Sequence, residues 1–278
     1  MLKTRVITAT ILLAVLLPIL FWLPPIYLSI AFLIMMSLAA WEWASLVTPN
    51  AKKAAYIYAF FCLLVMIIFA LAQIPELDIA LLILALSFWI FAMPWILFRG
   101  IKLQLERLRL FFSTIGLIVL SATWLTITIL RDFGLVWLLT IFCLVWMADI
   151  GAYFIGRSFG RRPLAITISP GKTLEGALGG MVLCWIYAWA CVQFLPPEET
   201  LFGVWVFRFG WFSAWCLVTV LVLFSILGDL FESLLKRLGG VKDSSALLPG
   251  HGGVLDRIDA LLPVIPLAAF LSLIVRNV

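Results

Sequence analysis

The sequence predicts an all-α polytopic membrane protein, and two observations carry this prediction. Hydrophobic residues make up 65% of the 278 residues and charged residues only 12%, whereas a soluble domain carries about 25% charged residues. Apolar runs long enough to cross the hydrocarbon core of a bilayer recur along the whole chain. This composition excludes a disordered chain, a secreted disulfide-rich domain and a nucleic-acid-binding domain.

Apolar segments of roughly 18–23 residues predict about nine transmembrane helices, because each segment can span a bilayer. Pro24 and Pro25 leave almost no loop between the first two segments, so we expect a tight helical hairpin there. Lys3 and Arg5 precede the first segment, which ends without a small-residue cleavage site, so we expect a retained signal anchor. The predicted spans are 5–23, 26–47, 54–73, 79–98, 109–129, 135–155, 173–195, 208–228 and 259–276.

The distribution of positive charge predicts the orientation of the chain. With the N-terminus placed in the cytoplasm, the 19 Lys and Arg residues all fall on the cytoplasmic side except Arg131, Arg208 and Arg276. Because Lys and Arg are enriched in cytoplasmic loops, we expect a cytoplasmic N-terminus and a C-terminus on the opposite side of the membrane. The polar loops 156–172 and 229–258 would then face the cytosol.

We expect the two halves of the chain to differ in role. Residues 1–129 would form a scaffold of transmembrane helices for dimer contacts and lipid access, and residues 130–278 would form the catalytic region. The five cysteines lie inside apolar runs, away from the single histidine. They therefore resemble small buried hydrophobic residues rather than a disulfide framework or a zinc site.

Four polar side chains near the end of the eighth predicted span share one face of a helix. They are Asp229, Glu232, Ser233 and Lys236. A carboxylate in contact with lipid is costly, so this face must point toward water or protein. It is either a salt-bridge ladder beside the membrane or a cation site in a polar pocket.

The segment that follows favours the cation site. Gly252 and Gly253 would let backbone N–H groups approach an anion. Asp256 and Asp259 lie one helical turn apart and, with Asp229, could form an oxygen-rich Mg²⁺ site. Carboxylates for a metal beside cations for phosphates are what phosphoryl or nucleotidyl transfer needs. The cations suited to phosphates are Lys236, Arg237, Lys242 and Arg257.

This segment also carries a resemblance to a known family. It resembles the signature of phosphatidate cytidylyltransferases, or CDP-diacylglycerol synthases, and the similarity to the bacterial members covers nearly the whole chain. The signature is Ser233-x-Leu235-Lys236-Arg237-x4-Lys242-Asp243-x-Ser245-x2-Leu248-Pro249-x-His251-Gly252-Gly253-Val254-x-Asp256-Arg257-Ile258-Asp259. Further matches are Trp41-Glu42-Trp43, Asp149-x-x-Ala152-Tyr153-x-x-Gly156 and Ser169-Pro170-Gly171-Lys172-Thr173-x-x-Gly176.

The resemblance implies that the protein converts CTP and phosphatidate into CDP-diacylglycerol and pyrophosphate for phospholipid synthesis. It also implies Mg²⁺ as cofactor, while the participation of a second, monovalent cation stays open. We expect a homodimer in the bacterial cytoplasmic (inner) membrane, with the active site facing the cytosol and no nucleic-acid partner.

The resemblance also implies the site residues. The predicted catalytic residues are Asp229, Lys236, Arg237, Lys242, Asp243, His251, Asp256, Arg257 and Asp259, with Asp229, Asp256 and Asp259 as metal ligands. The predicted substrate contacts are Ser169, Lys172, Thr173, Glu232, Ser233, Gly252, Gly253 and Asp149.

Several roles stay open at this point. Thr173 or Ser169 is suited to begin the following helix, and Gly171-Lys172-Thr173 is not a P-loop, because position 166 is isoleucine. Asp149 could bind a metal or orient a basic group. Glu42 could occupy an interfacial or helix-packing position or serve catalysis. His251 could act as a general acid, donate a hydrogen bond to phosphate or brace the glycine-rich turn.

Two other functions compete with this interpretation. A CTP-dependent lipid kinase of the polyprenol or dolichol type would transfer the γ-phosphoryl group to an alcohol and release CDP. A transporter would spread its charges through the depth of the bilayer, whereas the charges here gather at the predicted cytosolic side. The aspartate-rich pattern of CDP-alcohol phosphotransferases is absent from the sequence.

Overall fold

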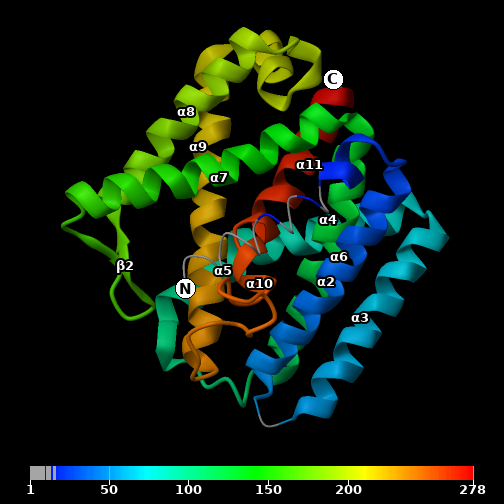
Figure 1. The fold of residues 1–278 in the computed structure, drawn as a ribbon, viewed down its shortest axis with the longest axis vertical. Helices are drawn as coiled ribbons and strands as arrows, with labels where there is room; N and C mark the ends of the chain where they lie inside the picture. Colours follow the sequence, from blue (N-terminus) through cyan, green and yellow to red (C-terminus); the bar gives the residue numbers. More distant parts are fainter. Residues whose placement is uncertain (1–9, 11–13, 15–16, 50, 278) are drawn as a thin grey trace.

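Long helices and one small two-stranded sheet build the protein in the computed structural model, which describes residues 10, 14, 17–49 and 51–277 (Figure 1). Within this described part, 7 helices are long and apolar enough to cross a membrane, and Leu261–Arg276 forms a shorter apolar helix. The protein is therefore an all-α polytopic membrane protein.

The elements are α2 (Pro25–Val47), α3 (Lys52–Ala72), α4 (Pro75–Ser87), the π-helix η1 (Phe88–Ala92), α5 (Met93–Arg99), the 3₁₀ helix η2 (Gly100–Lys102), α6 (Arg109–Phe133), α7 (Leu135–Phe159), β1 (Pro163–Ala165), β2 (Ser169–Thr173), α8 (Leu174–Phe194), the 3₁₀ helix η3 (Pro197–Glu199), α9 (Leu201–Leu238), α10 (Leu255–Ile258) and α11 (Leu261–Asn277).

Each predicted span from 26–47 onward corresponds to one of these helices or to the α4–α5 helical unit. The first predicted span, 5–23, lies largely outside the described residues, so the count of nine stays a prediction. The span predicted at 208–228 is the middle of α9, which runs from Leu201 to Leu238 and bends at Gly210, where φ is 77° and ψ is 170°.

Both predicted polar loops are shorter in the structure than the sequence suggested. α9 continues through Leu238, so the loop predicted to begin at residue 229 begins at Gly239. The helix continues because its polar side chains find ionic partners, as described below. The loop predicted at 156–172 begins after Phe159 and contains the antiparallel β1–β2 hairpin.

An aromatic cluster fixes the end of α9 that carries the polar side chains. Phe231 lies within 5.5–6.3 Å, ring centroid to centroid, of Trp43, Phe88, Trp89 and Phe112. These rings come from α2, η1 and α6, so three parts of the chain hold one turn of α9. α11 packs against α6 and α9, so helices from both halves of the chain share one core.

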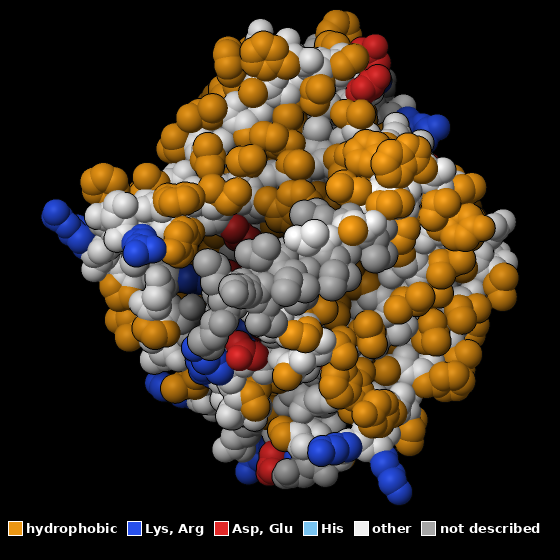
Figure 2. Space-filling view, in the orientation of Figure 1, with side chains coloured by type: hydrophobic (Ala, Val, Ile, Leu, Met, Phe, Trp, Pro, Cys, Tyr) orange, Lys and Arg blue, Asp and Glu red, His pale blue; other side chains and the backbone are white. Residues whose placement is uncertain are grey.

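Most connections between helices lie toward two ends of the molecule, and the β1–β2 hairpin that connects α7 to α8 lies at its left edge (Figure 1). The α2–α3 connection, residues 100–108 and the loop 239–254 lie toward one end, and the α8–α9 connection and the C-terminus lie toward the other. Hydrophobic side chains cover most of the visible face, and most Lys and Arg side chains lie at its lower and left edges (Figure 2). This arrangement suits a membrane protein with one basic end. Which end faces the cytosol stays a prediction.

Close contact between α7 and α8 depends on small residues. A Cβ atom added at Gly180 would lie 2.6 Å from the carbonyl oxygen of Ala148. Small residues allow this close approach of helix backbones in membranes.

We expect Gly180→Val to lower stability by about 1–3 kcal/mol through overpacking, measured as thermal unfolding in detergent. Gly171→Ala is the control, because nothing lies within 4 Å of a Cβ there. Equal unfolding temperatures for the Gly180 variant and the unmodified protein would contradict the expectation.

Candidate active site

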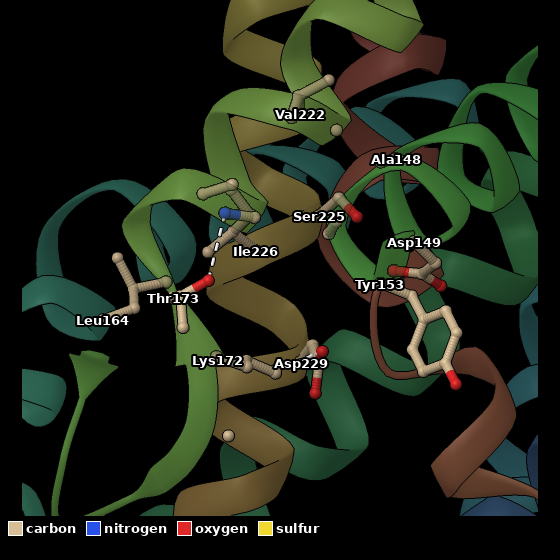
Figure 3. Close-up of a pocket in the computed structure, with 15 residues that line it drawn as sticks. Ala148, Asp149, Tyr153, Leu164, Lys172, Thr173, Val222, Ser225, Ile226 and Asp229 are labelled. Atoms are coloured by element: carbon tan, nitrogen blue, oxygen red, sulfur yellow. Dashed lines mark hydrogen bonds and ion pairs between the residues drawn. The ribbon is translucent and has the colours of Figure 1, made fainter. Parts of the chain in front are cut away.

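A cavity of about 300 Å³ opens between α7, β2, α8 and α9 (Figure 3). Leu164, Val222 and Ile226 give it an apolar wall. Its polar lining is Asp149, Tyr153, Lys172, Thr173, Ser225 and Asp229. The cavity therefore combines an apolar surface with charged groups, which suits an amphiphilic molecule.

An ion pair joins two of the predicted site residues in this cavity. The Nζ atom of Lys172, on β2, pairs with Oδ2 of Asp229, on α9, and the two side chains point toward each other in Figure 3. The carboxyl groups of Asp149 and Asp259 lie within electrostatic range of both partners. Three acidic groups thus surround one lysine, and a surplus of acidic groups favours a bound cation.

The β1–β2 hairpin holds Lys172 at the cavity. Thr173 ends β2 and caps α8, and its Oγ1 accepts a hydrogen bond of 3.1 Å from the Gly176 N–H, which confirms the predicted helix start. Glu175 accepts hydrogen bonds of 3.0 and 3.1 Å from two backbone N–H groups just before β1. Arg237 Nε donates to the Ile168 carbonyl at 3.3 Å, which ties the hairpin to α9.

A second cluster lies one turn further along α9. Lys236 Nζ donates to Asp256 Oδ1 at 2.7 Å and pairs with Glu232. Relative exposure is only 15% for the side chain of Lys236, 2% for Glu232 and 9% for Asp256. Burial opposes ionisation of Asp256, but hydrogen bonds with Glu232, with Lys236 and with the Gly253 N–H outweigh it and lower the pKa of Asp256 below its usual range. Asp256 is therefore a carboxylate held in place.

Glu42 is a site residue whose role the sequence left open. It lies on α2 with a relative exposure of 0%, and its carboxylate accepts hydrogen bonds from the loop that connects α9 to α10. Of the alternatives that the sequence left open, a position at the membrane interface is wrong, because the side chain is buried inside the protein. The sequence signal was an acid between two tryptophans inside an apolar segment, where an acid needs a partner.

Comparison with known proteins agrees with the resemblance seen in the sequence. The model of the cytidylyltransferase family matches residues 3–275. The chain belongs to this family. It is 38% identical over 273 residues to the phosphatidate cytidylyltransferase of Pseudomonas aeruginosa, covering 98% of this chain and 97% of the relative. The phosphatidate cytidylyltransferase of Haemophilus influenzae is 36% identical (97% and 98% covered), and that of Staphylococcus haemolyticus is 34% identical (95% and 96% covered).

The other predicted residues of this cytidylyltransferase lie on the loop 239–254, on α10, on α9 and on β2. Lys242 and Asp243 are exposed, whereas Ser233 and Ser169 are half-buried. Arg257 Nε donates to the His251 carbonyl at 2.9 Å and so braces the loop. The Gly253 N–H donates to Asp256 at 2.8 Å, and Gly252 next to it has φ +79°. A protein carboxylate thus takes the N–H group that the sequence suggested for a phosphate.

The three predicted metal ligands fall into two groups. Asp229 and Asp259 interact with each other and with Lys172, whereas Asp256 belongs to the Lys236 cluster. Among the described residues, no three His, Cys, Asp or Glu side chains are arranged to hold one ion. Mg²⁺ commonly uses one or two carboxylates together with substrate phosphates and water. The surplus of carboxyl groups around Lys172 therefore fits such an ion.

Neutralisation of the buried cluster by Lys236 gives a testable expectation. Lys236→Met leaves Glu232 and Asp256 buried without a counter-charge, and we expect a loss of about 3–5 kcal/mol of stability. Thermal unfolding in detergent measures it. The double variant Lys236→Met, Glu232→Gln should recover part of the loss, because it removes one of the two acids.

Lys242→Met is the matched control, because Lys242 lies exposed on the neighbouring loop. An unfolding temperature of Lys236→Met equal to that of the unmodified protein would show that the cluster contributes nothing to stability.

Proposed function

We propose that this protein transfers the cytidylyl group of CTP to phosphatidate, giving CDP-diacylglycerol and pyrophosphate for phospholipid synthesis. The observation that carries the proposal is the match to named phosphatidate cytidylyltransferases over almost the full length of both chains. The cavity adds independent support, because an apolar wall beside paired charges suits a lipid with a phosphate headgroup.

The proposed reaction is an in-line displacement at phosphorus. A phosphate oxygen of phosphatidate forms a bond to the α-phosphorus of CTP, and the bond from that phosphorus to the bridging oxygen of pyrophosphate breaks. The attacking oxygen is already anionic near neutral pH, so the reaction needs no strong general base. The protein would contribute positioning and neutralisation of phosphate charge.

The residues at the cavity divide into cations and carboxylates. Lys172 would release Asp229 and pair with a substrate phosphate, and Arg237 and Lys236 lie along the same end of α9. Asp229 and Asp259 are the proposed ligands for Mg²⁺ at the cavity. Asp256, which accepts hydrogen bonds from Lys236, Ser244 and the Gly253 N–H, would have to release Lys236 to join them. When bound, Mg²⁺ would neutralise charge on the phosphate oxygens. Lys242 and Arg257 would hold further phosphate charge from the loop side.

The proposed setting is the bacterial cytoplasmic membrane, with the cavity open to the cytosol and the protein present as a homodimer. The excess of Lys and Arg at the lower and left edges of the molecule supports this orientation (Figure 2). CTP would then reach the cavity from water while phosphatidate stays in the membrane.

The reaction products test the proposal directly. Purified protein in detergent would receive phosphatidate, Mg²⁺ and CTP labelled at the α-phosphorus. We expect label in the organic phase and pyrophosphate in the aqueous phase, with both lost on addition of EDTA and in the absence of phosphatidate. Label confined to water-soluble CDP would indicate a lipid kinase instead. No consumption of CTP with any lipid would contradict both functions.

Removal of the proposed metal ligands tests the site. Asp229→Asn and Asp256→Asn should each lower turnover by about 10²-fold or more and raise the Mg²⁺ concentration needed for half-maximal activity. Asp132→Asn is the control, because this exposed aspartate at the end of α6 does not line the cavity. Turnover and Mg²⁺ dependence equal to those of the unmodified protein in both variants would overturn the metal assignment.

A further inference from the structure

Glu42 carries a buried carboxylate whose partners all come from one distant loop. Its Oε1 accepts from Ser245 Oγ at 2.5 Å and from the Val254 N–H at 2.9 Å. Its Oε2 accepts from the Leu255 N–H at 2.6 Å and lies 3.1 Å from Ser244 Oγ. None of the ion pairs found in the described part of the chain involves Glu42. Hydrogen bonds alone therefore compensate this buried side chain.

These hydrogen bonds connect α2 to the Lys236 cluster through one hydroxyl group. Ser244 Oγ lies 2.9 Å from Asp256 Oδ2 as well as 3.1 Å from Glu42. The Ser244 N–H also donates to Asp256, at 3.0 Å. The Ser244 hydroxyl has one proton and can donate to only one of the two acids at a time. A continuous polar path thus leads from Glu42 through Ser244 and Asp256 to Lys236.

A glycine in the loop shows independently that the loop is fitted to Glu42. A Cβ atom added at Gly253 would overlap Oε1 of Glu42 and Oγ of Ser244. Any larger residue at position 253 would push the loop away from α2. The sequence therefore combines an acid at position 42 with the one residue type that lets the backbone approach it.

The geometry argues against direct contact between Glu42 and a substrate. Oε1 has two donors, Oε2 has one backbone donor and shares the Ser244 hydroxyl with Asp256, and the residue has no exposed surface. A carboxylate in this state has no free position for a proton of a substrate or for a phosphate group. Its effect on a reaction must pass through the groups that it holds.

We infer that Glu42 is a positioning residue, which fixes the loop 244–255 so that Asp256 and Lys236 stand in place for the transfer reaction. Its catalytic effect rests on the proposed function. Its effect on the loop does not, because the hydrogen bonds exist whatever the reaction is. Misplacement of a reacting group by about 1 Å can cost 10²-fold in rate, so the loss of this anchor should act on turnover.

The experiment compares Glu42→Gln with the unmodified full-length protein in two measurements. The glutamine keeps the shape but presents an NH₂ group to hydrogen-bond donors. Hydrogen–deuterium exchange should become at least about 10-fold faster in the peptide covering 244–255 and stay unchanged in α6 and α7, because only the loop loses its anchor. In the cytidylyl transfer assay, kcat should fall about 10- to 100-fold while KM for CTP stays within about 3-fold.

Three further variants separate the effect of the carboxylate from that of a single hydrogen bond and from that of losing an acid elsewhere. Glu42→Asp keeps the charge and should regain part of both losses, and Ser245→Ala removes one hydrogen bond and should give a smaller version of both. Glu76→Gln is the matched control, because Glu76 is an exposed acid at the start of α4, and it should change neither measurement. If Glu42→Gln fails to fold, Ser245→Ala and Glu42→Asp carry the test.

The outcomes separate the two proposals. No transfer by the unmodified protein would defeat the proposed function, while the exchange result would still test the anchor. Transfer by the unmodified protein with unchanged kcat and unchanged loop exchange in Glu42→Gln would overturn the inference. Faster exchange spread evenly over all helices would also overturn it, because Glu42 would then serve only general stability.

Discussion

The cost of removing charge from water is the constraint on which this structure depends. A bundle with so few charged residues must give each buried one a partner. Lys172 pairs with Asp229, Lys236 pairs with Glu232 and Asp256, and Glu42 accepts the donors of one loop. Because the partners come from different elements, the same contacts that compensate charge also hold β2, α9, α2 and the loop 239–254 together.

The sequence correctly predicted the features that depend on residues close together in the chain, namely helix positions, a helix cap and an ion pair within one helix. Apolar segment lengths located the helices from α2 to α11, and Thr173 caps α8 as its residue type suggested. The spacing of Glu232 and Lys236 predicted a shared helix face, and they form an ion pair one turn apart. These features follow from periodicity and residue chemistry over a few residues, which a sequence records directly.

The sequence could not predict which distant groups meet. Asp256 and Asp259 lie one turn apart and were expected to point the same way, yet Asp256 turns to Lys236 and Asp259 interacts with Asp229. Asp259 keeps helical φ and ψ as the C-cap of α10, so the backbone does not separate the two side chains, and each interacts with the partner on its own side. The partners of Glu42 lie more than 200 residues away along the chain, and no local pattern identifies them. The extension of α9 to Leu238 also depends on distant partners, because Asp229 pairs with Lys172 and Lys236 pairs with Asp256.

The same helix carries both the apolar and the charged parts of the cavity, and this arrangement has a consequence for the proposed reaction. Val222, Ile226 and Asp229 line the cavity from successive turns of α9. With a rise of about 1.5 Å per residue, the wall and the acid are separated along the helix axis by about 10 Å at most. A lipid whose chain lies against Val222 would thus place its headgroup at the level of Asp229 and Lys172. The headgroup could react there while the chains stay in the membrane, because charged side chains and the apolar wall line the same cavity.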